Sequence, residues 1–110
     1  MPLPYPLTDE AADLIAHRFR LLAEPMRVKL LDRLRRGEAS VQDLAGALET
    51  TPQNVSKHLG VLAREGVVTR RKEGNFAYYR VADESIWAIC HLVCGGIEQR
   101  LEALRLELSA

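Results

Sequence analysis

The chain has 110 residues, and its 15 basic residues balance its 15 acidic ones. This length predicts one domain with a modest core, which a dimer would enlarge. The neutral total gives no support to a polyanion partner, so such a partner must be argued from where charges cluster. No basic segment followed by an apolar run opens the chain, so we expect neither a signal peptide nor a membrane anchor, and a cytoplasmic protein.

The chain is expected to begin with an arm and to continue as a single domain. Residues 1–7 contain three prolines and are expected to form an extended N-terminal arm, followed by one domain over residues 8–110. Thr8 can cap the first helix, because Asp9 and Glu10 then occupy the first turn, where the helix dipole favours negative charge.

Two further helices are predicted before residue 50. One opens with Pro25 in its first turn and ends at Arg36 and Gly37. The next is short and begins at Ser40, because Ser40 followed by Asp43 resembles a capping box. Its apolar residues then recur at helical spacing: Val41, Leu44, Ala45 and Leu48.

A fourth helix is strongly indicated, because Thr51 can act as its N-cap and Pro52 suits its first position. Its apolar residues lie at i, i+4 and i+7 and should face a core: Val55, Leu59 and Leu62. The remaining surface is polar, with small side chains among longer ones: Gln53, Asn54, Ser56, Lys57, Gly60, Val61 and Arg64. Such a face can enter a DNA major groove and reach base edges and phosphates.

A basic hairpin is predicted directly after this helix. Gly66 can end the helix in a left-handed conformation, and residues 67–73 and 76–81 read as two strands joined by a turn at residues 74–75. Between residues 53 and 80 there are six basic residues and two acidic ones, an excess of four positive charges. A basic wing beside a helix-turn-helix suits contact with phosphates, although a solvated helix beside a charged hairpin would have a similar pattern.

Ten residues are therefore candidates for contact with double-stranded DNA. Gln53 can pair with adenine through both amide atoms, and Lys57 can reach guanine or a phosphate. His58 is interpreted either as a DNA contact or as a residue packed under the wing, and we favour proximity to DNA. The full set consists of Ser40, Thr51, Gln53, Asn54, Ser56, Lys57, His58, Arg71, Lys72 and Asn75.

The last quarter of the chain predicts one long helix, from about residue 83 to near residue 108. Apolar residues alternate along it by three and four, which is typical of a helix that pairs with another helix. Gly95 and Gly96 interrupt this apolar stripe, and each costs roughly 1 kcal/mol relative to alanine, so we expect close backbone approach at a dimer axis.

Residues 18–82 resemble the ArsR/SmtB family of small winged-helix transcriptional regulators. The resemblance rests on LLAEPMRVKLLDRL, VQDLAGAL, TPQNVSKHLGVLAREGVV and RKEGNFAYYRV, in the order and spacing of that family. It implies a mainly α fold with about five helices and a two-stranded wing. It also implies a homodimer that binds an imperfect palindrome and releases it when an inducer binds. The expected interface comprises Leu14, Phe19, Ile86, Cys90, Val93, Ile97, Leu101 and Leu104.

The metal sites that this family commonly uses are absent from the sequence. Members that sense arsenic, cadmium or lead carry Cys-x-Cys where this chain has residues 40–42, Ser-Val-Gln. Members that use the last helix for zinc, cobalt or nickel place ligands at the positions of Asp83, Ser85, Gly96 and Gln99. Only the aspartate among these can bind a metal, and one carboxylate cannot hold zinc.

The sequence does not decide which signal the protein senses. The candidate sensing residues are Cys90, His91 and Cys94. The two thiols lie on neighbouring turns and could pack as small apolar groups, take part in thiol-based redox sensing, or bind a soft metal. His17 could join them as a ligand if the first helix faces the last one. No cofactor is assigned from the sequence.

Two other classes of function need to be compared with DNA binding. A winged helix can serve as a protein-interaction module, or as a subunit of a two-protein sensor whose partner detects the signal. An enzyme is disfavoured, because no Ser/His/Asp set, glycine-rich phosphate loop or carboxylate pair has a useful spacing.

Overall fold

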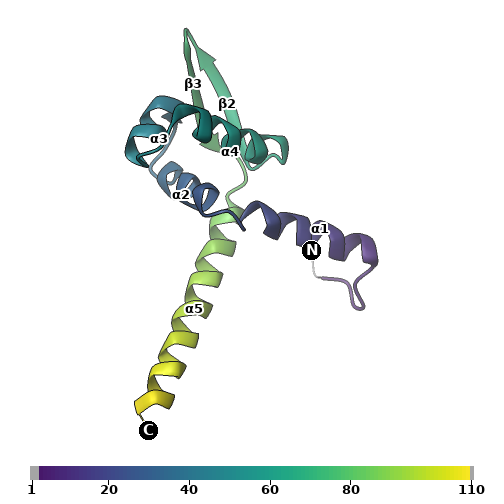
Figure 1. The fold of residues 1–110 in the computed structure, drawn as a ribbon. Coiled ribbons are helices and arrows are strands. Elements are labelled where there is room, and N and C mark those ends of the chain that lie inside the picture. The colour runs from purple at the N-terminus through teal and green to yellow at the C-terminus, as the bar shows by residue number, and fades with distance from the viewer. Residues whose placement is uncertain (1–2, 110) are drawn as a thin grey trace.

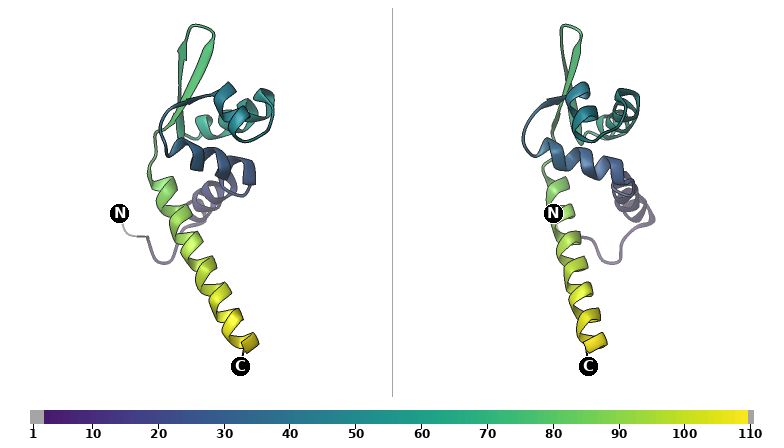
Figure 2. Two further views of the ribbon diagram at one scale, coloured as in Figure 1. Left: turned by 90° about the vertical axis from the view of Figure 1, so that its left-hand side faces the viewer. Right: turned by 60° about the vertical axis from the view of Figure 1, so that its left-hand side comes forward.

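A computed structural model describes residues 3–109 of the chain. The molecule is elongated, with extents of 58 × 40 × 20 Å and a radius of gyration of 17.1 Å. A compact chain of this length would have a radius of gyration of about 13 Å. Figures 1 and 2 show the cause: the hairpin projects from one end of a small head, and a long C-terminal helix projects from the other.

Five helices and three strands make up the described residues. The helices are α1 (Asp9–Leu21), α2 (Pro25–Leu34), α3 (Val41–Ala47), α4 (Pro52–Arg64) and α5 (Ser85–Ser109). The strands are β1 (Ala39–Ser40), β2 (Val68–Glu73) and β3 (Phe76–Val81). The helices and the hairpin lie where the sequence predicted them, which confirms a winged helix-turn-helix.

The predicted N-caps are confirmed. The side-chain oxygens of Thr8, Ser40 and Thr51 each accept a hydrogen bond from a backbone N–H three residues later, at 3.1, 3.0 and 3.1 Å. Each bond satisfies one of the donors that the first turn of a helix leaves unpaired. After α4, Gly66 has the left-handed φ of 74° that the sequence predicted for this helix end.

The sheet has a third strand that the sequence analysis missed. Its strand order is β1-β3-β2, with Ala39 opposite Tyr79 and Ser40 opposite Tyr78. Two residues are too few to produce a period-2 pattern, so only the pairing itself reveals β1. The consequence is that β3 is paired on both sides, which anchors the wing to the segment that leads into α3.

One apolar core fills the head. Helices α2, α3 and α4 and the base of the sheet supply nearly all of it: Leu30, Leu31, Leu34, Val41, Leu44, Ala45, Val55, Leu59, Leu62, Val67, Val68 and Tyr79. From α1 only Leu21 is buried, and from the 25 residues of α5 only Ile86 is buried. The assignment of Ile86 to the dimer interface was therefore wrong, because this side chain belongs to the core of its own chain.

Polar bonds fasten the two terminal helices to the head. The indole Nε1 of Trp87 donates to the backbone oxygen of Leu31 at 3.2 Å, which holds the first turn of α5 against α2. Arg18 of α1 pairs with Asp83, just before α5, at 3.0 Å. These contacts are made only at the helix ends nearest the head, so the rest of α5 extends away from it (Figure 1).

The remaining length of α5 exposes apolar side chains. Val93, Ile97 and Leu101 are 49%, 55% and 60% exposed. Leu14 and Phe19 of α1 are 72% and 51% exposed, so these five expected interface residues are available to a second chain. Space around Gly95 and Gly96 is open, because a Cβ on either would meet nothing within 4 Å in the described part of the chain. None of the described helices is long and apolar enough to cross a membrane.

Candidate nucleic-acid interface

The outer face of α4 is polar and accessible. Gln53, Ser56 and Lys57 are all exposed, as the sequence analysis required of groups that contact DNA. Asn54 is half-buried, and its side-chain Nδ2 donates to Thr50 Oγ1 at 3.1 Å, so this amide helps to close the start of α4. The exposed set is one helical turn long and offers amide, hydroxyl and ammonium groups, a mixture that can bond both base edges and phosphates.

His58 is not on this face, so its assignment as a DNA contact was wrong. The side chain is only 7% exposed and points into the head. Its Nδ1 lies 3.3 Å from Nη1 of Arg27, which donates the hydrogen bond because a guanidinium has no acceptor. Burial lowers the pKa of His58, and the nearby cations Arg27 and Lys57 lower it further, whereas Glu24 raises it. His58 is therefore a neutral packing residue that accepts a bond from α2.

The capping residues Ser40 and Thr51, both candidate DNA contacts, differ in accessibility. Ser40 is only 4% exposed and its hydroxyl is used by Asp43 N, so a direct contact with DNA was wrongly assigned to it. Pairing of β1 with β3 covers this residue, which the sequence could not reveal. Thr51 remains exposed beside Gln53, so its role near phosphate stays a prediction.

The strand register divides the basic residues of the wing between two faces. Arg70 lies opposite Tyr79, and Lys72 lies opposite Ala77. Residues two apart on a strand share a face, so Arg70 and Lys72 lie on the face of Val68, which is buried in the core. Neither cation has an ion-pair partner among residues 3–109. Arg70 contributes to the local positive charge but was not among the predicted site residues, although strand alternation places it on the same face as Lys72.

Arg71 lies on the opposite face of the wing and is held there. Its guanidinium donates to both carboxylate oxygens of Glu38, at 2.6 and 3.1 Å, and to Glu73 at 2.5 Å. It also lies over the ring of Tyr78, 4.8 Å from the ring centroid. The bond from Arg71 lowers the pKa of Glu38, and the bonds to Glu38 and Glu73 raise the pKa of Arg71. Arg71 therefore braces the wing against the segment before β1, and its role as a phosphate contact stays a prediction.

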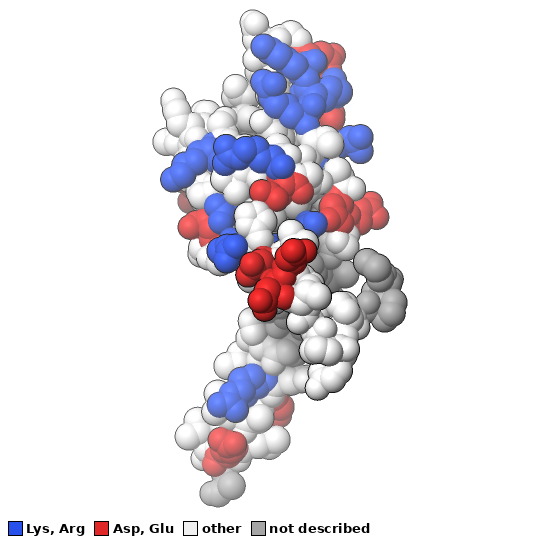
Figure 3. Space-filling view, turned by 90° about the vertical axis from the view of Figure 1, so that its right-hand side faces the viewer, with Lys and Arg blue, Asp and Glu red and all other residues white. Residues whose placement is uncertain are grey.

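Positive charge gathers at one end of this face of the molecule. In Figure 3, Lys and Arg side chains cover much of the wing and form a second band across the head below it. Acidic side chains gather further down, toward the base of the head. On this face, basic side chains thus outnumber acidic ones at the wing end, which favours contact with a polyanion there.

The thiols and histidines lie apart from this face. Cys90 is half-buried, Cys94 is exposed, and both are free thiols. Burial raises the pKa of Cys90, which reduces its thiolate fraction and favours the packing interpretation. His17 Nε2 lies 2.9 Å from Glu65 at the end of α4, so in one chain it does not face α5. In residues 3–109, no three His, Cys, Asp or Glu side chains form a group that could hold a metal ion.

Both the sequence and the fold are similar to those of known proteins. Residues 22–71 match the family described as "Helix-turn-helix domain". The biofilm growth-associated repressor of Agrobacterium fabrum is 34% identical over 82 residues, which span 74% of this chain and 70% of that protein.

Two solved structures are similar over 90% of this chain. One is the crystal structure of AntR, an antimony-specific transcriptional repressor, with a TM-score of 0.79, 31% identity and 90% of that chain covered. The other is the solution structure of Mb0332 from Mycobacterium bovis, a homodimeric winged helix-turn-helix domain described as a possible ArsR-family transcriptional regulator. Its TM-score is 0.72 at 31% identity, with 94% of that chain covered.

Proposed function

The chain belongs to the ArsR/SmtB family of winged-helix transcriptional regulators, and on that premise we propose that it is a homodimeric repressor that binds an imperfectly palindromic operator. The observation that carries the proposal is the position of unpaired polar and basic side chains on two adjoining elements. These are Gln53, Ser56 and Lys57 on α4, and Arg70 and Lys72 on the same side of the wing. Such a protein would act where its DNA is, in the cytoplasm, and we assign it no catalytic activity.

The two elements would have different tasks on DNA. We assign α4 to the major groove, where Gln53 would read a base edge and Lys57 would contact either guanine or a phosphate. Arg70 and Lys72 would contact phosphates beside that groove, and Asn75 at the hairpin turn would add a further polar contact. Because Arg71 is already occupied by two carboxylates, we expect it to act on DNA affinity through the position of the wing.

Dimerisation would set the spacing of the operator. The exposed apolar residues of α1 and α5 support pairing of the terminal helices of two chains, and the Mycobacterium bovis domain of similar fold is homodimeric. Two recognition helices related by a twofold axis would read two half-sites roughly one helical turn, about 34 Å, apart. An inverted repeat is therefore the expected form of the operator.

We propose that the inducer does not bind at either of the two metal sites that the family commonly uses. Ser40 is a buried helix cap where a metal-binding thiolate would be needed. Asp83 is bonded to Arg18 and Ser85, and the bond from Ser85 lowers its pKa. We therefore propose that the signal is another small molecule, a thiol oxidant acting at Cys90 and Cys94, or a separate sensor protein.

Fluorescence anisotropy with DNA from the region upstream of the gene tests the proposal. We expect Lys57→Ala and Arg70→Ala each to weaken binding to all sequences and to reduce the salt slope by about one. Gln53→Ala should instead cost about 1 to 3 kcal/mol at one base pair and relax the preference there. Arg100→Ala on α5 is the matched control and should leave DNA affinity unchanged. Binding that neither basic substitution affects would contradict the proposed DNA face.

A further inference from the structure

A groove on the head remains unexplained by DNA binding. It lies between the C-terminal ends of α2 and α3 and consists of two adjoining cavities of about 550 and 610 Å³ that are open to solvent. Arg33, Arg36 and Ala47 line both cavities. The volume is in the range of small-molecule sites, roughly 300 to 1,000 Å³. None of the lining residues comes from α1 or α5, the helices proposed to form the dimer.

Three of the six charged side chains that line this groove are paired with other described residues. Asp32 pairs with Arg35, and Glu38 pairs with Arg71 of the wing. Arg33 and Arg36 have no ion-pair or side-chain hydrogen-bond partner among the described residues. Asp43 is the remaining carboxylate, and it lines only the second cavity. The part of the groove common to both cavities therefore holds two unpaired guanidinium groups.

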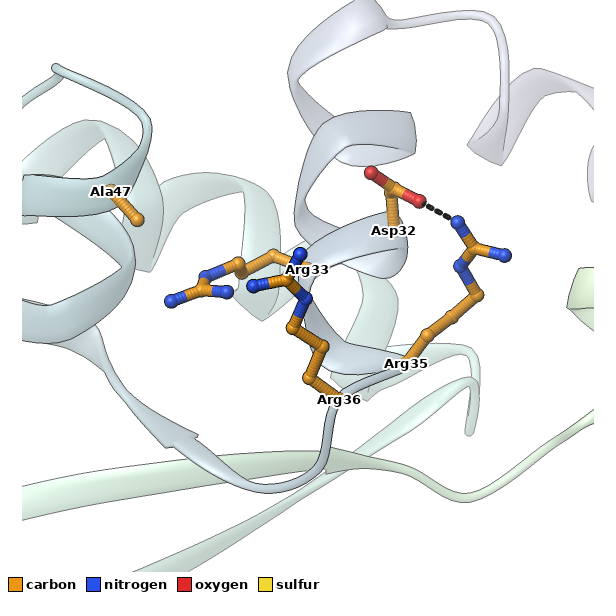
Figure 4. Close-up of a pocket in the computed structure, with 5 residues that line it drawn as sticks. All are labelled: Asp32, Arg33, Arg35, Arg36 and Ala47. Atoms are coloured by element: carbon orange, nitrogen blue, oxygen red, sulfur yellow. Dashed lines mark hydrogen bonds and ion pairs between the residues drawn. The ribbon is translucent and has the colours of Figure 1, made fainter.

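Arg33 and Arg36 line the same two pockets. Figure 4 shows the side chain of Arg33 extending toward Ala47 and that of Arg36 extending back beside Arg33, whereas Arg35 turns away toward Asp32. Adjacent like charges repel, and an anion between them removes that cost. The short side chain of Ala47 leaves the space in front of them open. A guanidinium presents its N–H donors as a planar fork that fits phosphate and carboxylate oxygens.

We propose that this groove is a binding site for a small phosphate monoester, held by Arg33 and Arg36 and covered on one side by Ala47. A phosphate monoester carries close to two negative charges above pH 7 and has three terminal oxygens, so each guanidinium can bond its own oxygens. A single carboxylate offers half that charge. The cavity is larger than a phosphate group, so the organic part of the ester has room beside Gly37 and Leu44.

Stabilisation of helix ends is the simplest competing role for these arginines. Basic residues near a helix C-terminus interact favourably with its dipole, and Arg33 is in the last turn of α2. That role requires no ligand, and it predicts lower thermal stability when the arginines are replaced. The proposed site predicts loss of ligand binding, so the two roles are separated by measuring both quantities on the same variants.

The test is calorimetric titration of the full, DNA-free protein with glycerol 3-phosphate, at constant ionic strength set with sodium chloride. We expect saturable binding that Arg33→Gln and Arg36→Gln each weaken by about tenfold, because each removes a charge-assisted bond. Lys29→Gln, an exposed change one turn earlier on α2, is the matched control and should bind like the parent. Because no DNA is present, failure here leaves the repressor proposal unaffected.

A tethered anion gives a second and independent test. Ala47→Glu places a carboxylate opposite the two arginines, so it should abolish the binding of glycerol 3-phosphate while both arginines remain. Ala47→Gln fills the same space without charge and should weaken binding much less. Inorganic phosphate and succinate serve as additional probes, and tighter binding of succinate than of the ester would overturn the assignment to a phosphate monoester.

Two results would overturn the site altogether. The first is the lack of saturable binding at concentrations up to about 10 mM, or binding that neither arginine substitution changes. The second is that Arg33→Gln and Arg36→Gln weaken DNA binding without any added anion while no small anion binds, since the groove would then be part of the DNA surface.

Discussion

The head and helix α5 bury their apolar residues to very different extents. In the head, Leu30, Leu44 and Leu59 are completely buried against neighbouring elements. In α5, Ile97 and Leu101 remain more than half exposed, although the helix is the longest in the chain. The same residue types are thus buried in the core of the head and exposed along α5, where a second chain can cover them. Apolar periodicity in a sequence shows that a helix face will be covered, but not by which chain.

Removing a buried leucine from the head should produce the largest effect. Leu59→Ala deletes a completely buried side chain from α4 and leaves a cavity, so it should lower the free energy of unfolding by about 3 kcal/mol. Urea denaturation at a fixed protein concentration measures the change. Leu106→Ala is the matched control, since this side chain is 57% exposed, and it should cost less than about 0.5 kcal/mol. Equal losses for the two variants would remove the contrast between the head and α5.

A charge on the α5 stripe should separate the subunits without unfolding the head. Leu101→Asp places a carboxylate on the stripe in both subunits, which should weaken the dimer by about 2 kcal/mol or roughly thirtyfold. Sedimentation velocity over a dilution series measures the dissociation. Leu106→Asp lies on the same helix but off the stripe, and it should sediment like the parent. An unchanged dimer in Leu101→Asp would place the interface elsewhere.

The smallest effect is expected from the buried histidine, and it depends on pH. Burial lowers the pKa of His58 below 6.5, so the unfolded chain takes up this proton first as the pH falls. The contribution of neutral His58 to the free energy of unfolding is therefore fully present above about pH 6.5 and decreases as the pH falls below that value. The lowered pKa values of Asp83 and Glu38 act only in more acidic solution.

Replacement of His58 should weaken the dependence of stability on pH. His58→Gln keeps an acceptor for Arg27 but does not titrate, so its urea midpoint should fall less between about pH 7.5 and about pH 5.5. His91→Gln removes an exposed histidine and should retain the dependence of the parent. A fall of equal size in His58→Gln would assign the acid sensitivity to other groups.

The sequence predicted the fold almost completely, because each helix carries its own boundary signals. Thr8, Ser40 and Thr51 are caps that act within three residues, and Gly66 ends α4 by its own conformation. Strand β1 could not be predicted, because its two residues are specified only by their pairing with β3.

The site was predicted less well, and the errors have different physical origins. His58 lies three residues after Val55 and four before Leu62, so helical spacing already placed it on the buried face of α4. Strand alternation likewise places Arg70 and Arg71 on opposite faces of the wing, so the sequence already indicated that their contacts differ. The carboxylates that hold Arg71 come partly from Glu38, 33 residues away, and no local pattern predicts such a contact.

The bonds made by Arg27 have a mechanical consequence. Its Nε and Nη2 donate to the backbone oxygens of Leu21 and Arg20 at 2.7 and 3.2 Å, and its Nη1 donates to His58 in α4. One side chain from α2 thus acts as a joint between the end of α1 and the inner face of the recognition helix. If α1 changes its angle when two subunits shift, it must either turn α4 with it or break these bonds. The end of α1 is therefore connected to α4 through Arg27, and the contact of His17 with Glu65 makes a second connection between the same two helices.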